Sequence, residues 1–148
     1  MELSEAKHSL ICETENFDNL IVLKTLSKAI GLAGIRLGFC VSNKTIIKAI
    51  NALRSPYNIN SMTQKVGEII LNEQKYLDIC IKKIIESRNF LVSNLKEENF
   101  TFIQKAFDTN ANFVFIKAKN ASKVKSYLAQ NKIAIRQFGD YLRICAGT

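Results

Sequence analysis

The stretch NLIVLKTLSKAIGLAGIRLG, Asn19–Gly38, decides the fold of this chain. Its first part, Leu20–Lys24, is apolar, rich in Ile and Val, and of strand length, which predicts a buried strand. The polar group Thr25–Lys28 follows and places two hydroxyls beside one amine, and Arg36 comes eight residues after that amine. The glycines of the stretch permit turns that β-branched residues could not make. A second strand is therefore predicted over Leu37–Val41.

The amine, the hydroxyls and the guanidinium of this stretch together indicate one kind of ligand. A lysine condenses with aldehydes, whereas hydroxyls, backbone N–H groups freed by glycine, and an arginine bind phosphate. A small molecule that carries both an aldehyde and a phosphate is pyridoxal 5′-phosphate (PLP). We therefore expect Lys28 to be catalytic and to bind PLP, and we expect Thr25, Ser27 and Arg36 to bind its phosphate.

The run TLSKAIGLAGIRLGF, Thr25–Phe39, resembles the cofactor-lysine motif of fold-type I PLP enzymes, in particular the histidinol-phosphate aminotransferase group. The resemblance covers nearly the whole chain and is specific again at YLRICAGT, 141–148. It implies an α/β fold: a remnant of the PLP-binding large domain over residues 1–70, then a small C-terminal α+β domain with an antiparallel sheet over 71–148. It also implies a homodimer that transfers an amino group between glutamate and the phosphorylated keto substrate imidazole acetol phosphate, in histidine biosynthesis.

Two arginines near the C-terminus are candidate substrate-binding residues. Arg143 matches the Leu-Arg-Ile segment of the family, whose arginine binds the substrate carboxylate. Arg136 matches a position that in histidinol-phosphate aminotransferases contacts the substrate phosphate. The alternative for both is an exposed charge on a sheet face.

Periodicity predicts the remaining elements. Ser42 and Ser61 are expected to be the N-caps of the first two helices. Amphipathic spacing predicts helices over Lys44–Leu53, Ser61 to about Asn72, Tyr76–Leu95 and Asn120–Asn131. Alternating or apolar patterns predict strands over Phe100–Gln104, Asn112–Lys117, Ile133–Arg136 and Tyr141–Cys145.

Composition excludes several classes of protein. The chain has 148 residues, of which 47% are apolar, and a net charge of +8. Its lysines are spread along the sequence without interleaved aromatic residues, so we expect solvated surface and no nucleic-acid partner. Four scattered cysteines and the single histidine, His8, argue against a metal site or a disulfide framework. We expect no membrane segment and a cytoplasmic protein.

The family's Asp-Glu-Ala-Tyr motif, whose carboxylate faces the pyridine nitrogen of PLP, does not occur in this sequence. We therefore expect a C-terminal portion of a longer enzyme that alone binds PLP poorly and is inactive. The strands Leu20–Lys24 and Leu37–Val41 should then expose apolar surface, and we expect either that self-association covers it or that the region is disordered. Two alternatives stay open: a sister PLP enzyme (threonine-phosphate decarboxylase or an aromatic aminotransferase), and a non-catalytic basic binding module.

Overall fold

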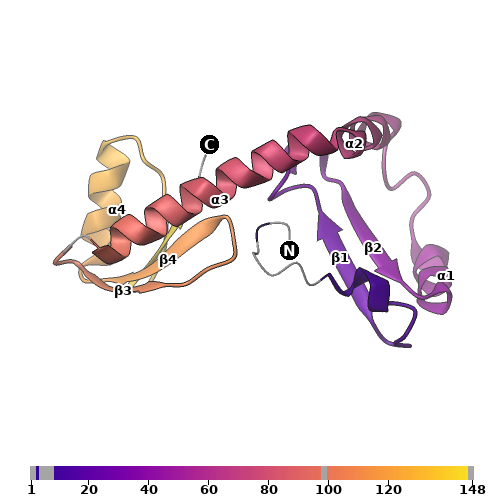
Figure 1. Ribbon diagram of the computed structural model, residues 1–148, viewed down its shortest axis with the longest axis horizontal. Helices are drawn as coiled ribbons and strands as arrows, with labels where there is room; N and C mark the ends of the chain where they lie inside the picture. The colour runs from indigo at the N-terminus through magenta and orange to yellow at the C-terminus, as the bar shows by residue number, and fades with distance from the viewer. Residues whose placement is uncertain (1–2, 4–8, 98–99, 147–148) are drawn as a thin grey trace. The chain divides into compact units, whose positions relative to one another are not determined.

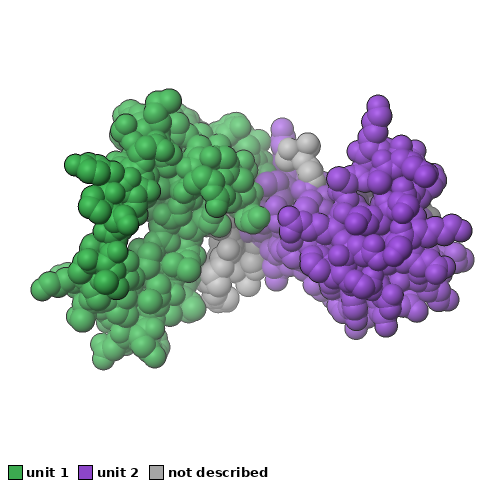
Figure 2. Space-filling model, turned by 180° about the vertical axis from the view of Figure 1, so that it is seen from behind, with its two compact units in different colours: residues 1–2, 6–80 green, residues 3–5, 81–148 purple. Residues whose placement is uncertain are grey.

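The computed structural model describes residues 3, 9–97 and 100–146. It divides into two compact units (Figure 2): unit 1 contains residues 1–2 and 6–80, and unit 2 contains residues 3–5 and 81–148. The helix α3 (Gln74–Glu97) begins in unit 1 and ends in unit 2. The expected division into domains at residue 70 stays a prediction. Within the described ranges no helix has the length and apolarity that a membrane span requires.

Unit 1 is built around a two-stranded antiparallel sheet (Figure 1). Its elements in chain order are η1 (Leu10–Glu13), β1 (Ile21–Thr25), η2 (Ala33–Ile35), β2 (Gly38–Ser42), α1 (Lys44–Leu53) and α2 (Ser61–Asn72). The ladder between β1 and β2 runs from the pair Ile21↔Ser42 to the pair Thr25↔Gly38. The twelve-residue connection 26–37 between the strands carries the predicted cofactor lysine.

The sheet of unit 1 exposes apolar side chains on both faces. Leu23 and Ile21 of β1 lie on one face, and Leu23 is 77% exposed. Phe39 is also exposed but lies on the other face, because its ladder partner is Lys24. This confirms the expected apolar surface around these strands, and β1, along which burial alternates, is not buried on both faces within the described residues. Self-association through this surface stays a prediction.

The caps of α1 and α2 differ from the expectation. Ser42 is the last residue of β2, and its hydroxyl donates to the carbonyl of Leu20 at 2.5 Å. Asn43 is the N-cap of α1 instead, and Asn60 rather than Ser61 is the N-cap of α2. In both helices the Asn side chain accepts a hydrogen bond from a backbone N–H of the first turn. Both predictions were wrong by one residue because asparagine is as good an N-cap as serine.

Unit 2 contains a four-stranded antiparallel sheet in the order β3-β4-β6-β5. Its strands and second helix are β3 (Ile103–Phe107), β4 (Phe113–Ala118), α4 (Ala121–Gln130), β5 (Arg136–Phe138) and β6 (Tyr141–Cys145). The small α+β C-terminal domain with an antiparallel sheet is thereby confirmed.

The two edge strands begin later than predicted. The strands expected over Phe100–Gln104 and Ile133–Arg136 begin at residues 103 and 136 instead. Ile103 N donates to the carbonyl of Phe100 at 3.0 Å, which is a turn and not a ladder bond. β3 also contains an irregularity between Ile103 and Lys105, where its register against β4 shifts.

The core of unit 2 lies between one face of this sheet and the helices α3 and α4 (Figure 1). Burial alternates along β4, and Val114 and Ile116 are 0% and 1% exposed. Leu142 on the neighbouring β6 is also fully buried. The other face of β4 carries Phe113 and Phe115, because successive side chains of a strand point to opposite faces.

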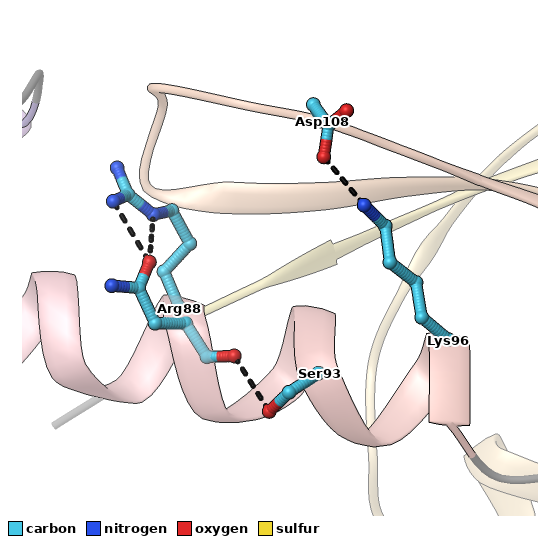
Figure 3. A network of polar contacts seen from close by, with 5 residues as sticks. Arg88, Ser93, Lys96 and Asp108 are labelled. Carbon is cyan, nitrogen blue, oxygen red and sulfur yellow. Dashed lines mark hydrogen bonds and ion pairs between the residues drawn. The ribbon is translucent and has the colours of Figure 1, made fainter.

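Arg88 and Lys96 of α3 make polar contacts within unit 2, and Figure 3 shows both side chains. Arg88 is only 3% exposed, and its Nη1 donates to the carbonyl of Leu3 at 2.7 Å. Its Nε and Nη2 donate to the side-chain oxygen of Asn89 at 3.0 and 2.9 Å. In the last turn of the same helix, Lys96 Nζ donates to the carboxylate of Asp108 at 2.6 Å. This contact lowers the pKa of the Asp108 carboxyl.

Candidate active site

The connection between β1 and β2 is closed by backbone hydrogen bonds just beyond the sheet. Leu26 N donates to the carbonyl of Leu37 at 3.3 Å, and Leu32 N donates to the carbonyl of Leu26 at 2.9 Å. Lys28 is two residues after Leu26, and Arg36 directly precedes Leu37. The closure therefore brings the backbones of the predicted cofactor lysine and the predicted phosphate arginine to one end of the strand pair.

This loop is held against α2. The side chain of Leu37 is 7% exposed and fills the space beside Gly67, where an added Cβ would lie 2.3 Å from Leu37 Cδ2. Thr63 on the same helix donates through Oγ1 to the carbonyl of Ile35 at 3.2 Å. Ala29 is buried as well, while its neighbour Lys28 is exposed. The loop is thus anchored by its apolar residues and presents the lysine outward.

The two hydroxyls before the lysine are hydrogen-bonded to each other. Thr25 Oγ1 donates to Ser27 Oγ at 3.0 Å and accepts from Ser27 N at 3.2 Å. The hydrogen of Thr25 is therefore committed to Ser27, whereas the Ser27 hydroxyl keeps its own hydrogen for a further acceptor. Of the two candidates, Ser27 is the better placed donor for a phosphate oxygen.

Arg36 has an unusual backbone conformation. Its φ is 54°, in the left-handed region, where a non-glycine residue costs of order 1 kcal/mol. Its Nη1 donates to the carbonyl of Ala33 at 3.3 Å, and the side chain is exposed. Gly31 is the residue of the loop where glycine is needed, with φ 74°. Arg36 is the C-cap of η2, a position where the left-handed conformation commonly ends a helical turn, and three other non-glycine residues of the described chain also have a positive φ.

The two predicted substrate arginines lie side by side in unit 2. Arg136 on β5 and Arg143 on β6 are direct partners in the antiparallel ladder, so both side chains lie on the same face of the sheet. Arg136 is exposed and Arg143 is partly buried. Directly opposed cations repel, so an anion bound between them would be stabilised by both.

Aromatic rings surround this arginine pair, which sequence patterns did not indicate. Four rings contact one another with centroids 5.3 to 6.4 Å apart: Phe107, Phe115, Phe138 and Tyr141. The guanidinium of Arg143 lies over the ring of Phe113, with Cζ 4.5 Å from the centroid. The rings come from four different strands, so their proximity to the cations does not appear as interleaving along the sequence. The alternation of Phe113, Phe115 and Lys117 was the available signal.

The residues of unit 1 match the chemistry that PLP requires. The loop offers an exposed amine, which is the group that condenses with an aldehyde, and a hydroxyl with a free hydrogen and an exposed guanidinium, which are groups that bind phosphate. Among the residues described here, no cluster of three or more His, Cys, Asp or Glu side chains could hold a metal ion.

Comparisons with known proteins identify the family of this chain. The family model "Aminotransferase class I and II" matches residues 2–148. The chain is 37% identical over 145 residues to the histidinol-phosphate aminotransferase of Clostridium novyi, an alignment that covers 95% of this chain and 40% of that protein. The chain thus spans about two fifths of the length of the curated relatives it matches.

Solved structures of histidinol-phosphate aminotransferases also match this chain. The histidinol-phosphate aminotransferase of Clostridium acetobutylicum superimposes with a TM-score of 0.85 at 25% identity, over 97% of this chain and 46% of that one. The enzyme of Sinorhizobium meliloti, solved in complex with pyridoxal-5′-phosphate, gives a TM-score of 0.75 at 25% identity, over 88% of this chain and 37% of that one.

Proposed function

Because the chain belongs to the class I and II aminotransferase family, we propose that it forms the lysine-bearing loop and the small domain of a PLP-dependent histidinol-phosphate aminotransferase. The observation that carries the proposal is the closed loop 26–37, which holds Lys28 and Arg36 at one end of β1 and β2. Unit 2 adds two arginines on one sheet face. The activity and substrates of the whole protein are part of this proposal.

The residues of this chain have distinct roles in it. Ser27 Oγ and the guanidinium of Arg36 bind the cofactor phosphate, with Thr25 orienting Ser27. Lys28 Nζ would hold the aldehyde carbon of the cofactor and, when its amine is free, would take up the proton that leaves the substrate Cα. PLP, when bound, supplies the electron sink that makes this proton acidic. Arg143 binds the substrate carboxylate, and Arg136 binds the phosphate of a phosphorylated substrate.

The proposed reaction is reversible amino transfer between glutamate and imidazole acetol phosphate, in the cytoplasm and in a homodimer. Its alternatives within the enzyme class are a threonine-phosphate decarboxylase and an aromatic aminotransferase. An aromatic aminotransferase would not need Arg136. Comparing phosphorylated with unphosphorylated amino acids as ligands therefore distinguishes an aromatic aminotransferase from the two enzymes whose substrates carry a phosphate.

Covalent trapping tests the role of Lys28 without an activity assay. The 148-residue chain is incubated with PLP, reduced with sodium borohydride, digested and analysed by mass spectrometry. Although we expect this chain alone to bind PLP poorly, reduction makes each bound cofactor permanent, so we expect the phosphopyridoxyl label at Lys28 in preference to other lysines. Lys28→Ala should abolish that label, whereas Lys48→Ala, which removes an exposed lysine of α1, should leave it unchanged. Labelling spread evenly over the surface lysines would refute the proposal and favour a non-catalytic basic module.

A further inference from the structure

The guanidinium of Arg143 has hydrogen-bond donors left over in the part of the chain that is described. Its Nε is buried and has no hydrogen-bond partner. Its Nη2 donates only to the sulfur of Cys145 at 3.8 Å, which is a weak interaction. No salt bridge to Arg143 is found among the described residues. Among the described residues, then, no carboxylate holds this side chain in place.

The ring of Phe113 is the group that contacts it. The direct partner of Phe113 across the ladder is Cys145, so Arg143 is its diagonal neighbour on β6. The guanidinium carbon lies 4.5 Å from the ring centroid, well within cation–π range. On its other side Arg143 faces the like charge of Arg136. Attraction by the ring and repulsion by Arg136 both favour this position of the guanidinium.

Phe113 also differs from the other rings of this sheet face. Four of them contact one another, whereas no ring–ring contact of Phe113 is found in the described part of the molecule. The close ring contact that Phe113 does make is with Arg143. The contact with the guanidinium therefore indicates that Phe113 does more than pack against the other rings of this sheet face.

We propose that Phe113 is a positioning residue for Arg143: its ring fixes the guanidinium without neutralising it, so that Arg143 can bind the oxyanion of a substrate. A carboxylate in the same place would orient the arginine equally well but would compete with that anion. The aromatic face orients the cation and leaves its hydrogen-bond donors available. This inference rests on the proposed role of Arg143 in substrate binding.

The test uses ¹H–¹⁵N spectra of the 148-residue chain, with the Arg143 Nε–Hε signal assigned through Arg143→Lys. Hε should be shifted upfield by the ring, and Phe113→Leu should remove that shift. Binding of inorganic phosphate and of glutarate, followed on the same signal, should weaken about three- to tenfold in Phe113→Leu, the size expected for one cation–π contact. Phe113→Tyr keeps the ring and should restore both the shift and the affinity.

Phe107→Leu is the matched control. It removes a ring of the same sheet face and also one cation–π contact, because Lys105 Nζ lies 4.8 Å from the Phe107 centroid. It should leave the Arg143 signal and the anion affinity unchanged. The inference is overturned if Phe113→Leu alters neither quantity, or if Phe107→Leu weakens anion binding as much. If the proposed function were wrong, PLP would not label Lys28 selectively. The Phe113 variants do not affect that labelling, so the two failures can be distinguished.

Discussion

Replacing Gly67 with alanine tests whether the loop that carries Lys28 is packed against α2 as described. At a solvent-exposed position inside a helix, the change from glycine to alanine increases the free energy of unfolding by about 1 kcal/mol, because glycine is the poorer helix former. Here the new Cβ would lie 2.3 Å from Cδ2 of the buried Leu37, and overpacking of this kind costs about 1–3 kcal/mol. We therefore expect Gly67→Ala to destabilise unit 1 by about 1 kcal/mol in sum.

The assay is urea unfolding followed by circular dichroism, with a double-mutant cycle. Leu37→Val removes the δ-methyl groups that the new Cβ would meet, so in this background Gly67→Ala should stabilise by up to about 1 kcal/mol. The sign reversal corresponds to a coupling of about 2 kcal/mol between the two positions. Amide exchange at Leu26, whose N–H closes the loop onto Leu37, should accelerate in Gly67→Ala alone. If Gly67→Ala stabilises the wild-type chain as it would an open helix, the packing of the loop against α2 is refuted.

Two further predictions concern unit 2. Arg88→Ala should destabilise it by about 2 kcal/mol, because the carbonyl of Leu3 loses a charged donor at 2.7 Å; in urea unfolding, Arg88→Lys should recover part of the loss, and a change below about 0.5 kcal/mol for Arg88→Ala would contradict this role. Asp108 should titrate below the ordinary pKa of aspartate, since Lys96 donates to it at 2.6 Å. The pair therefore contributes stability above the unfolded-state pKa, and this contribution is lost as the pH falls through the lowered folded-state pKa. Carboxyl NMR should show the pKa rising in Lys96→Ala, and an unchanged pKa would show that the ion pair is absent in solution.

Local patterns predicted the elements whose ends depend on local interactions. The helix Lys44–Leu53 and the strand Tyr141–Cys145 have the predicted bounds, because amphipathic spacing and turn residues define them. The edge strands β3 and β5 were shifted, since their ends depend on pairing with β4 and β6. Apolar residues such as Phe102 and Ile135, which looked like strand residues, pack against the core beside those strands instead.

The candidate site also contains one part that could be predicted from the sequence and one part that could not. The lysine loop could be predicted because its motif lies within one continuous stretch, which the structure closes by hydrogen bonds of Leu26 with Leu37 and of Leu32 with Leu26. The contact between Phe113 and Arg143 could not be predicted, because it joins residues on two strands and depends on their register. A pattern in one strand shows which face a residue occupies, but not its diagonal neighbour on the next strand.

The two neighbouring strands β3 and β4 should differ in how they tolerate insertions and deletions. β3 already contains a local irregularity after Ile103 at the edge of the sheet, and such a bulge absorbs an extra residue without disturbing the rest of the ladder. β4 has partners on both sides and separates Val114 and Ile116 from Phe113 and Phe115 on opposite faces. One residue gained or lost there would exchange the two sets. Among related sequences, we therefore expect insertions and deletions in the edge strand β3 and none in the central strand β4.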